Sequence, residues 1–236
     1  MQPGQAIRLN KFLAEHLGIS RRAADNLIEN GEILIEKPGE NKRPAVLGEH
    51  IDKDTKIWHN NKILEVDKPL QYIYLALNKP LNYICSKKRQ GDTPTIYEIL
   101  PEKYQKLKTV GRLDKNSSGL ILLTNDGDFA FQMTHPKFYK EKQYKVELDR
   151  PLEPLHQQMI ADFGVSLPDG RSRLGLSHTD NTRKSWLVTM SEGRNRQIRR
   201  TFAAVGYEVT KLHRIQFGKY QLGDLKEGNF VEVEKI

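Results

Sequence analysis

Hydrophobic residues near the amino terminus recur twice at helical spacing. Four apolar side chains with this spacing precede Gly18: Leu9, Phe12, Leu13 and Leu17. The glycine that follows them predicts the end of a first helix. A second helix is predicted over 21–30, because Ser20 is a good N-cap and Gly31 follows the last apolar position.

Extended patterns follow these helices at 32–36 and 56–66, on either side of a loop rich in Lys, Pro and Gly. The polar stretch 67–71 contains a proline, which is typical of a linker. We therefore expect two domains, a small one over 1–66 and a larger one over 67–236.

Strand patterns prevail in the larger domain. β-branched, aromatic and apolar runs predict strands at 72–77, 83–86, 120–124, 143–148 and 186–190. Short helices are predicted at 95–100, at 129–133 with Asp128 as its cap, and at 152–162, while 164–180 is expected to be mainly loop. The chain is thus predicted to be an α+β protein.

Composition narrows the class of protein and of partner. The hydrophobic share of 37% and the charged share of 29% suit a globular protein, and no apolar run approaches the roughly 18–20 residues that span a membrane. Nothing at the amino terminus suggests secretion, so we expect a cytoplasmic protein. The net charge of +8 favours a polyanionic partner, and nucleic acid is favoured over membrane because no strongly amphipathic basic helix is evident.

The single cysteine, Cys85, excludes an internal disulfide and a cysteine-rich zinc site. It lies in a predicted strand without a nearby histidine, so we interpret it as a small core residue rather than a nucleophile.

A charged, turn-rich loop between apolar segments carries one acid at its centre. Asp114 stands just before turn-favouring residues, and the apolar run beyond Gly119 leads to a second turn at 125–127. A carboxylate on a short loop against a buried strand is fixed in position and accessible to a substrate. Most aspartates in such loops only cap a helix or tie a turn, so that role is the alternative for Asp114.

The predicted strand at 143–148 alternates cleanly and places Tyr144 on its apolar face. Strand statistics favour a core aromatic there. A ring on an inward face beside a cleft could equally stack on a nucleobase.

A basic helix is predicted from Asn195. Its apolar face is formed by Ile198, Thr201, Phe202 and Val205, and Gly206 ends it. Arg199 lies at the edge of that face and can reach into a cleft. Three other arginines point elsewhere and are candidates for phosphate contacts, with a solvated helix end as the alternative: Arg194, Arg196 and Arg200.

The predicted amino-terminal helices carry a basic polar side formed by Arg8, Lys11, Arg21 and Arg22. Solvated bases on a helix are common, but the surrounding segments 7–14, 18–24 and 27–31 resemble the S4-type RNA-binding domain. That family uses its paired helices and the next strand as a basic platform for structured RNA. Asn10 stands where the pattern commonly has Asp, and the loop after Ile35 is longer than usual.

Three motifs in order resemble a bacterial ribosomal RNA pseudouridine synthase of the branch with an S4-type domain. They are Gly111-Arg112-Leu113-Asp114 with the run to Gly127, Lys142-Gln143-Tyr144, and the segment from Glu192 to Arg200. The resemblance covers nearly the whole chain. Two positions depart from the pattern: Asn82 replaces the glycine of a Lys-Pro-x-Gly turn, and Thr201 replaces a common methionine.

The resemblance implies that a uridine in RNA is detached from C1′ and reattached through C5. It implies Asp114 as the catalytic carboxylate, Tyr144 against the target base and as a candidate to assist proton removal, and Arg199 paired with Asp114, which stays ionised and oriented. Arg112 joins the RNA-contacting bases. The implied fold is a small S4-type α/β domain followed by a catalytic domain with a mixed, largely antiparallel sheet flanked by helices. Ribosomal RNA or an assembly intermediate is the implied partner, with no cofactor and no metal, and a monomer is the default.

The chemistry of the residues agrees with this reading. An ionised carboxylate can attack a glycosidic carbon or stabilise a cationic sugar, and a uridine must leave its stack to be reached. Two other hypotheses stay open: a non-catalytic RNA-binding or ribosome-assembly protein, and a metal-dependent nucleic-acid hydrolase built on Asp114, Asp126 and Asp128. The residues do not identify the uridine or the ribosomal subunit.

Overall fold

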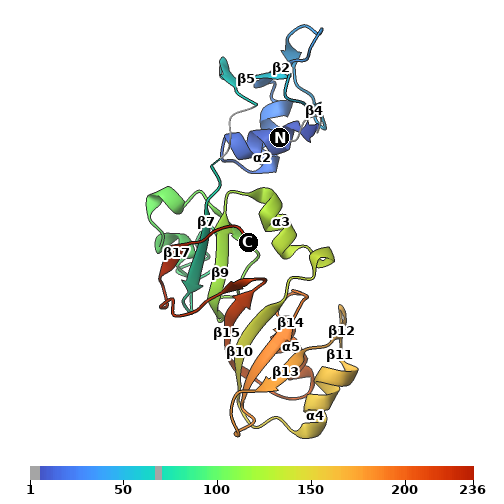
Figure 1. The fold of residues 1–236 in the computed structure, drawn as a ribbon, viewed down its shortest axis with the longest axis vertical. Helices are drawn as coiled ribbons and strands as arrows, with labels where there is room; N and C mark the ends of the chain where they lie inside the picture. The colour runs from blue at the N-terminus through green and yellow to red at the C-terminus, as the bar shows by residue number, and fades with distance from the viewer. Residues whose placement is uncertain (1–5, 67–70) are drawn as a thin grey trace. The chain divides into compact units, whose positions relative to one another are not determined.

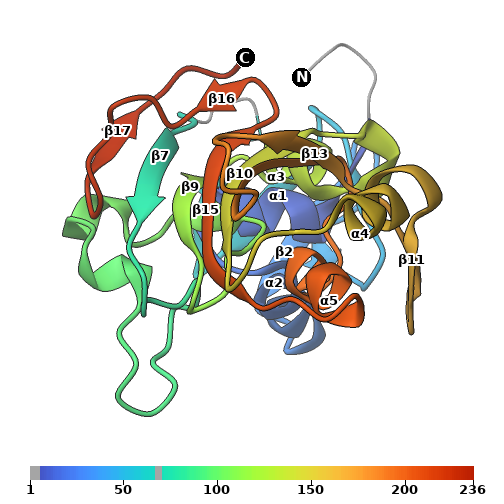
Figure 2. The same ribbon diagram turned by 90° about the horizontal axis from the view of Figure 1, so that it is seen from below.

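The computed structural model describes residues 6–66 and 71–236, which fold into two compact units, Met1–Tyr72 and Ile73–Ile236 (Figures 1 and 2). The predicted linker at 67–71 lies almost entirely outside the described residues. Each unit has its own hydrophobic core. Within the described ranges, no helix is long and apolar enough to cross a membrane.

The amino-terminal unit pairs two helices with a 4-stranded antiparallel sheet of order β3-β2-β5-β6. The helices are α1 (Leu9–His16) and α2 (Arg21–Glu29). The strands are β2 (Ile33–Glu36), β3 (Arg43–Pro44), β5 (Lys56–His59) and β6 (Lys62–Leu64), and a separate pair is formed by β1 (Ile7–Arg8) and β4 (His50–Ile51).

Local chemistry explains these boundaries. The Ser20 side chain accepts a hydrogen bond from the backbone N–H of Ala23, 3.0 Å away, and so caps α2 as predicted. The single extended run predicted over 56–66 was wrong. It is a hairpin, because Asn60 and Asn61 adopt left-handed backbone conformations (φ 49° and 60°) that reverse the chain.

The carboxy-terminal unit is built on a 9-stranded sheet. Seven strands follow the order β13-β14-β10-β15-β9-β7-β17, while β16 pairs with β15 and β8 pairs with β9. The strands are β7 (Tyr74–Lys79), β8 (Lys108–Val110), β9 (Ser118–Thr124), β10 (Lys142–Leu148), β13 (Gly175–His178), β14 (Ser185–Met190), β15 (Val209–Phe217), β16 (Tyr220–Gln221) and β17 (Phe230–Glu232). The sheet is mixed because β9 and β15 run parallel and the other pairs are antiparallel.

Helical segments cover both faces of this sheet (Figure 2). The α-helices are α3 (Gly127–Thr134), α4 (Pro154–Gln158) and α5 (Gln197–Ala204), and a π-helical segment, Met159–Phe163, continues α4. Short 3-10 helices lie at Ile96–Glu98, Glu102–Tyr104 and Pro136–Phe138. In β9 all seven residues are buried, and Leu122 packs with α3 while Ile121 packs in the cluster that includes Phe202 of α5.

Three local predictions were wrong in this unit. Residues 83–86 form no strand, only a single bridge between Ile84 and Thr95. Helix α3 is capped by Asp126 and not by Asp128, because the Asp126 carboxylate accepts the Phe129 N–H at 2.9 Å. The expected loop at 164–180 contains β13 and a separate hairpin, β11 (Val165–Leu167) with β12 (Gly170–Ser172).

Candidate active site

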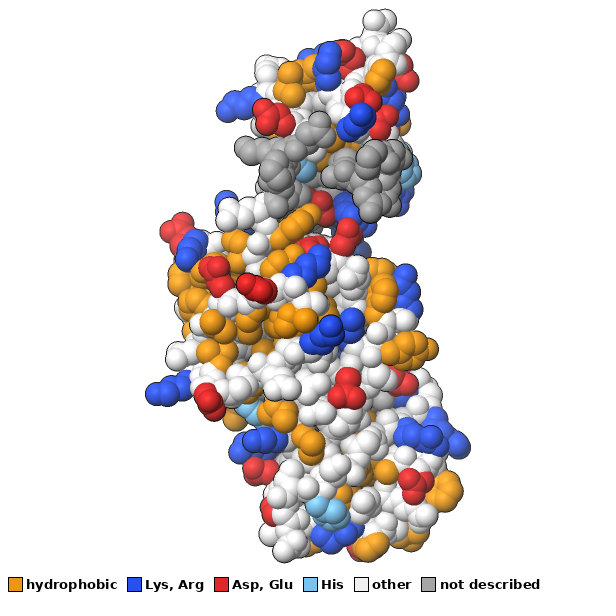
Figure 3. All heavy atoms as spheres, in the orientation of Figure 1, with side chains coloured by type: hydrophobic (Ala, Val, Ile, Leu, Met, Phe, Trp, Pro, Cys, Tyr) orange, Lys and Arg blue, Asp and Glu red, His pale blue; other side chains and the backbone are white. Residues whose placement is uncertain are grey.

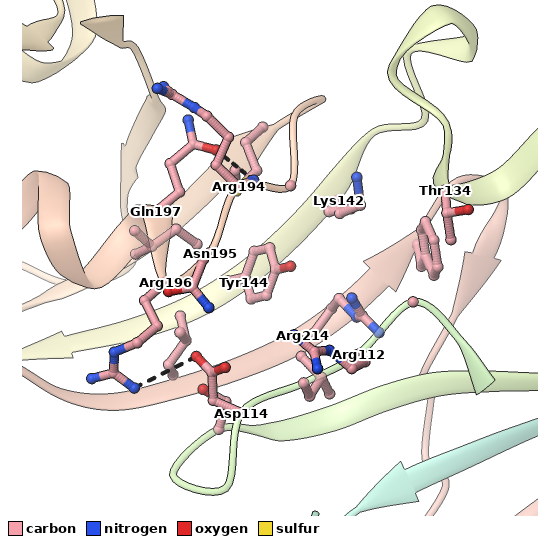
Figure 4. A pocket seen from close by; sticks show the side chains of 18 residues that line it. Arg112, Asp114, Thr134, Lys142, Tyr144, Arg194, Asn195, Arg196, Gln197 and Arg214 are labelled. Atoms are coloured by element: carbon pink, nitrogen blue, oxygen red, sulfur yellow. Dashed lines mark hydrogen bonds and ion pairs between the residues drawn. The ribbon is translucent and has the colours of Figure 1, made fainter. Parts of the chain in front are cut away.

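A cavity of roughly 330 Å³ opens in the carboxy-terminal unit, where the loop before β9 faces β10, β15 and the segment before α5 (Figure 4). Asp114 is the one carboxylate among the described residues that line it. Five basic side chains line it as well: Arg112, Lys142, Arg194, Arg196 and Arg214. An acid in a strongly electropositive cavity therefore marks this site.

The loop that carries Asp114 is anchored from behind by a buried lysine. The Lys79 Nζ donates to the carbonyls of Pro80 and Ser117, at 2.8 and 2.7 Å. Ser117 also closes the turn, since its N–H donates to the Asp114 carbonyl at 3.1 Å. The fully buried ammonium thus ties the end of β7 to the Asp114 loop, and burial lowers the pKa of Lys79 to about 8.

The turn after Lys79 has Asn82 where the family pattern commonly has glycine. Asn82 adopts a left-handed conformation (φ 65°), which asparagine tolerates better than most residues. Its N–H donates to the Lys115 carbonyl at 2.8 Å, one residue beyond Asp114. The substitution therefore preserves a second support of the loop.

Cys85 lies behind the same loop. Its thiol lies 3.4 Å from both the carbonyl oxygen and the amide nitrogen of Leu113. Burial raises the pKa of Cys85, which makes the reactive thiolate scarcer. The thiol packs as a structural group, as predicted.

Close backbone approach fixes the loop on its other side. Gly119 pairs with Arg214 across the parallel β9–β15 ladder. A Cβ at Gly119, where φ is +102°, would lie 2.2 Å from the Arg214 carbonyl oxygen. Only glycine permits this contact, which brings Arg214 beside the Asp114 loop.

Arg196, and not the predicted Arg199, forms the ion pair with Asp114. The Arg196 Nη1 lies 3.6 Å from the Asp114 Oδ2. Arg199 instead donates to two backbone carbonyls, Val209 at 2.5 Å and Asn116 at 2.6 Å. The prediction of a direct Arg199 pair was wrong because these two carbonyls engage its guanidinium. Arg196 precedes the helix, which begins at Gln197, and has a left-handed backbone (φ 47°).

Tyr144 lies where the strand pattern predicted, in the centre of the cavity wall (Figure 4). It is 7% exposed and is flanked by Val188 of β14 and Arg214 of β15. Its ring therefore belongs to the hydrophobic core and also lines the cavity. The two roles that the strand pattern left open, a core aromatic and a ring beside a cleft, are both compatible with this position.

Two buried cations in the cavity wall were missed from the sequence. Lys142 is 8% exposed, and its Nζ donates to the carbonyls of Lys140, Ser191 and Glu192 at 3.1–3.3 Å. Arg214 is 3% exposed and its Nε donates to the Leu120 carbonyl at 2.7 Å, while its Nη2 is buried without a partner in the described residues.

Burial, with the neighbouring Arg214 charge, lowers the pKa of Lys142 to about 8. A usable signal existed in the sequence, because Lys142 is in phase with Tyr144 and Arg214 with Leu212.

The remaining predicted arginines divide into two kinds. Arg194 and Arg200 both contact Asp169 in the β11–β12 turn, at 3.1 and 2.6 Å, and Arg194 also bonds Glu192. Both side chains therefore hold this turn, and their contact with phosphates stays a prediction. Arg112 is exposed at the cavity mouth and has no hydrogen bond or ion pair within the described residues.

The amino-terminal bases show a similar division. Arg8, Arg21 and Arg22 are exposed and unpaired in the described part of the chain, while Lys11 is half-buried. Both arginines of α2 stand in its first turn, where the helix dipole disfavours positive charge.

The carboxylates of the proposed metal site are not gathered. Asp126 is buried and engaged by Phe129, by the Tyr74 hydroxyl at 2.7 Å and by the Lys235 ammonium at 2.8 Å. No group of three or more His, Cys, Asp or Glu suited to a metal occurs in the ranges that the structure describes. The geometry thus favours carboxylate chemistry at Asp114 alone.

Comparisons with known proteins identify the class to which this site belongs. A profile of the RNA pseudouridylate synthase family matches residues 73–204. The chain is 34% identical to "Ribosomal small subunit pseudouridine synthase A" of Pasteurella multocida, over 95% of this chain and 94% of the relative. It is 33% identical to "Ribosomal large subunit pseudouridine synthase B" of Bacillus subtilis, over 96% of this chain and 91% of that protein.

A solved structure titled "Crystal structure of pseudouridylate synthase" agrees, with a TM-score of 0.67 and 33% identity over 97% of this chain and 96% of the other. The chain belongs to the RNA pseudouridine synthase family.

Proposed function

We propose that this protein converts a uridine of ribosomal RNA into pseudouridine, with Asp114 as the catalytic carboxylate. The observation that carries the proposal is a single carboxylate in a cavity that is lined by Tyr144 and by five basic side chains. Relatives named for both ribosomal subunits match at 34% and 33% identity, so the proposal extends to ribosomal RNA and leaves the subunit open.

The reaction breaks the C1′–N1 bond and forms a C1′–C5 bond, and a proton leaves C5 as one is gained at N1. Atoms and electrons balance without a redox partner, so no cofactor enters the proposal. Asp114 either attacks C1′ or stabilises the sugar cation that forms there. Tyr144 supplies the surface against which the flipped base packs, and Arg196 orients the carboxylate through their ion pair.

Arg199 acts in this proposal as a positioning residue. Its guanidinium joins the Asn116 carbonyl in the catalytic loop to the Val209 carbonyl of β15. It thereby holds the loop at Asn116, two residues beyond Asp114. Arg199, which the sequence motif singled out, therefore keeps a role at the site in this proposal. Arg112 and Arg196 remain the basic side chains of this unit that are best placed to contact RNA.

The amino-terminal unit is proposed to be an S4-type RNA-binding domain. The support is its pair of helices with unpaired Arg8, Arg21 and Arg22, beside a sheet and loops in which Lys37, Arg43 and Lys56 are paired with glutamates. Cations kept in the first turn of α2 lower helix stability, and contact with phosphates explains why they stand there. We further propose that the protein acts in the cytoplasm as a monomer.

The central test is Asp114→Asn, which retains size and removes the carboxylate charge. We expect pseudouridine formation to fall by about 10⁴-fold or more, as for loss of other essential nucleophiles, with RNA affinity within about twofold of wild type. The measurement is pseudouridine mapping of both large ribosomal RNAs from cells that carry each variant, with affinity measured by filter binding.

Asp128→Asn is the matched control. It makes the same chemical change as Asp114→Asn, at a residue that does not line the cavity. It should leave modification intact. Full activity of the Asp114→Asn protein would overturn the assignment. Strand cleavage that depends on added divalent metal would instead support a hydrolase.

A further inference from the structure

An exposed aromatic cluster stands at the carboxyl end of α3 and in the turn that follows. Phe131 is 48% exposed and Tyr139 is 76% exposed, although large apolar side chains are usually withdrawn from water. His135 and Phe138 complete the cluster, with ring centroids 4.7 and 5.8 Å from that of Phe131. We call these four rings the aromatic platform.

The platform is built rigidly for a surface feature. The His135 ring accepts the Lys137 N–H at 3.3 Å and starts a 3-10 turn, and the Tyr139 N–H closes that turn on the Pro136 carbonyl at 3.1 Å. Tyr139 itself is left-handed (φ 47°), which is uncommon for an aromatic residue. The turn thus presents the Tyr139 ring outward at the cost of backbone strain.

A cation covers part of the platform. The Lys137 Nζ lies 4.7 Å from the Phe138 ring centroid and 5.3 Å from that of Phe131. In Figure 3, hydrophobic and basic side chains lie next to one another on the right-hand side of the carboxy-terminal unit, where Figure 1 places α3 and the segment after it. Lysine is depleted at the centre of protein–protein interfaces, so this composition suits a nucleic acid better than a protein partner.

The platform adjoins the cavity. Thr134 lines the cavity and lies on the same helix, one turn after Phe131. Its methyl group is 3.5 Å from the position of a Cβ on Gly111, in the loop that leads to Arg112 and Asp114. The platform therefore lies beside one rim of the cavity.

We propose that the aromatic platform stacks an unpaired nucleobase next to the uridine in the cavity. The inference rests on the proposed function, because that function puts a single-stranded segment of RNA at the rim. Base stacking on aromatic rings tolerates every base, so the platform would add affinity and hold the strand without reading its sequence.

The test compares two probes on the full-length protein: a 12-residue oligouridine and a 12-unit ribose-phosphate strand without bases. The platform variant is Phe131→Ala with Tyr139→Asn, since asparagine accepts the left-handed backbone. We expect its affinity for oligouridine to fall roughly tenfold, as for the loss of one stacked base, and its affinity for the abasic strand to stay unchanged. In the Asp114→Asn background the same loss should appear.

Phe163→Ala with Leu155→Ala is the matched control, because these side chains are 59% and 62% exposed but do not line the cavity. It should bind both probes as wild type does. Equal losses on the two probes would overturn stacking and indicate electrostatic contact alone. Unchanged oligouridine binding would also overturn it.

Failure of the proposed function would look different. A protein that never forms pseudouridine in either ribosomal RNA would still show the probe-selective loss if the platform stacks bases. Conversely, an active enzyme whose platform variant binds both probes normally would retain the proposed function and lose this inference.

Discussion

The two units divide the charge of the chain unequally. Residues 1–72 contain 11 Lys and Arg against 11 Asp and Glu, whereas residues 73–236 contain 27 against 19. The whole net charge of +8 therefore belongs to the unit with the cavity. The surplus of positive charge in the whole chain favoured nucleic acid as the partner. It did not indicate that the proposed RNA-binding surface of the amino-terminal unit lies on its helices.

The neutral unit separates its charges instead of accumulating them. Its sheet and the adjoining loops pair Lys37 and Arg43 with Glu49, and Lys56 with Glu36. The arginines on or beside the helices have no such partners in the described residues. The proposed RNA-binding surface of this unit thus consists of arginines left unpaired in a domain that has no excess of positive charge.

The largest effect is expected where the catalytic unit depends on one glycine. Gly119→Ala should destabilise that unit by at least about 3 kcal/mol, because the new Cβ meets the backbone of Arg214. The amino-terminal unit, with its separate core, should keep its stability. Hydrogen exchange in each unit measures both.

Gly91→Ala is the control that measures the cost of a left-handed backbone alone, without a steric clash. Gly91 also has a positive φ, of 56°, but a Cβ there meets nothing within 4 Å. Its cost should be limited to about 1–2 kcal/mol. Similar losses for the two variants would show that the close approach of β9 and β15 is unimportant.

A smaller effect should separate the two arginines of the active site. Arg199→Lys removes one of two backbone hydrogen bonds, so it should cost about 1–2 kcal/mol and lower kcat roughly tenfold. Arg196→Lys retains a charge beside Asp114 and should cost little stability. If Arg199→Lys keeps full stability and activity, the guanidinium does not position the loop.

In the amino-terminal unit, Arg21→Gln with Arg22→Gln should weaken RNA binding about three- to tenfold and reduce the salt slope by about 1–2. The same change removes two cations from a helix amino terminus, so the unit should gain about 0.3–1 kcal/mol per residue. Weaker binding with higher stability distinguishes a functional role from a structural one. The paired bases give the control, Lys37→Gln with Lys56→Gln, which should leave the salt slope unchanged.

A further expected effect concerns pH and belongs to the catalytic unit. Lys79 and Lys142 have pKa values lowered to about 8 in the folded state, from 10.5. Between pH 8 and 10.5 the unfolded chain therefore binds more protons than the folded one, and these groups make stability rise with pH. Thermal unfolding of wild type relative to Lys142→Met should show this rise, and an equal pH dependence in both proteins would contradict it.

The secondary structure was largely predictable where one local signal dominates. The apolar run of β9, the alternation of β10 and the glycine-terminated helices all needed only periodicity. No strand was predicted at β8, at β17 or at β15, although β15 is the longest strand of the sheet. The edge strand β13 and the hairpins were missed as well, because their residues are mostly exposed and their pairing depends on neighbours distant in sequence. The left-handed Asn60 and Asn61 reversed a run that otherwise looked extended.

At the site, loop chemistry and strand phase made Asp114 and Tyr144 candidates only, and the family motifs selected them. The choice between Arg196 and Arg199 could not be made from sequence, because it depends on the left-handed backbone of Arg196 and on two carbonyls, of Asn116 and Val209, that engage Arg199. Lys142 and Arg214 were overlooked because charged residues are expected outside, although their phase placed them inside. In this protein, basic residues at inward strand positions are buried beside the cavity.

The pairing of β7 with β17 sets an order of events during synthesis. Leu77 is opposite Phe230, so the edge of the catalytic sheet cannot close until nearly the whole chain has emerged from the ribosome. The amino-terminal unit makes its contacts within the first 72 residues and can fold long before. A nascent chain would thus acquire its proposed RNA-binding surface well ahead of its completed catalytic sheet, and the long sequence separation makes that last step slow.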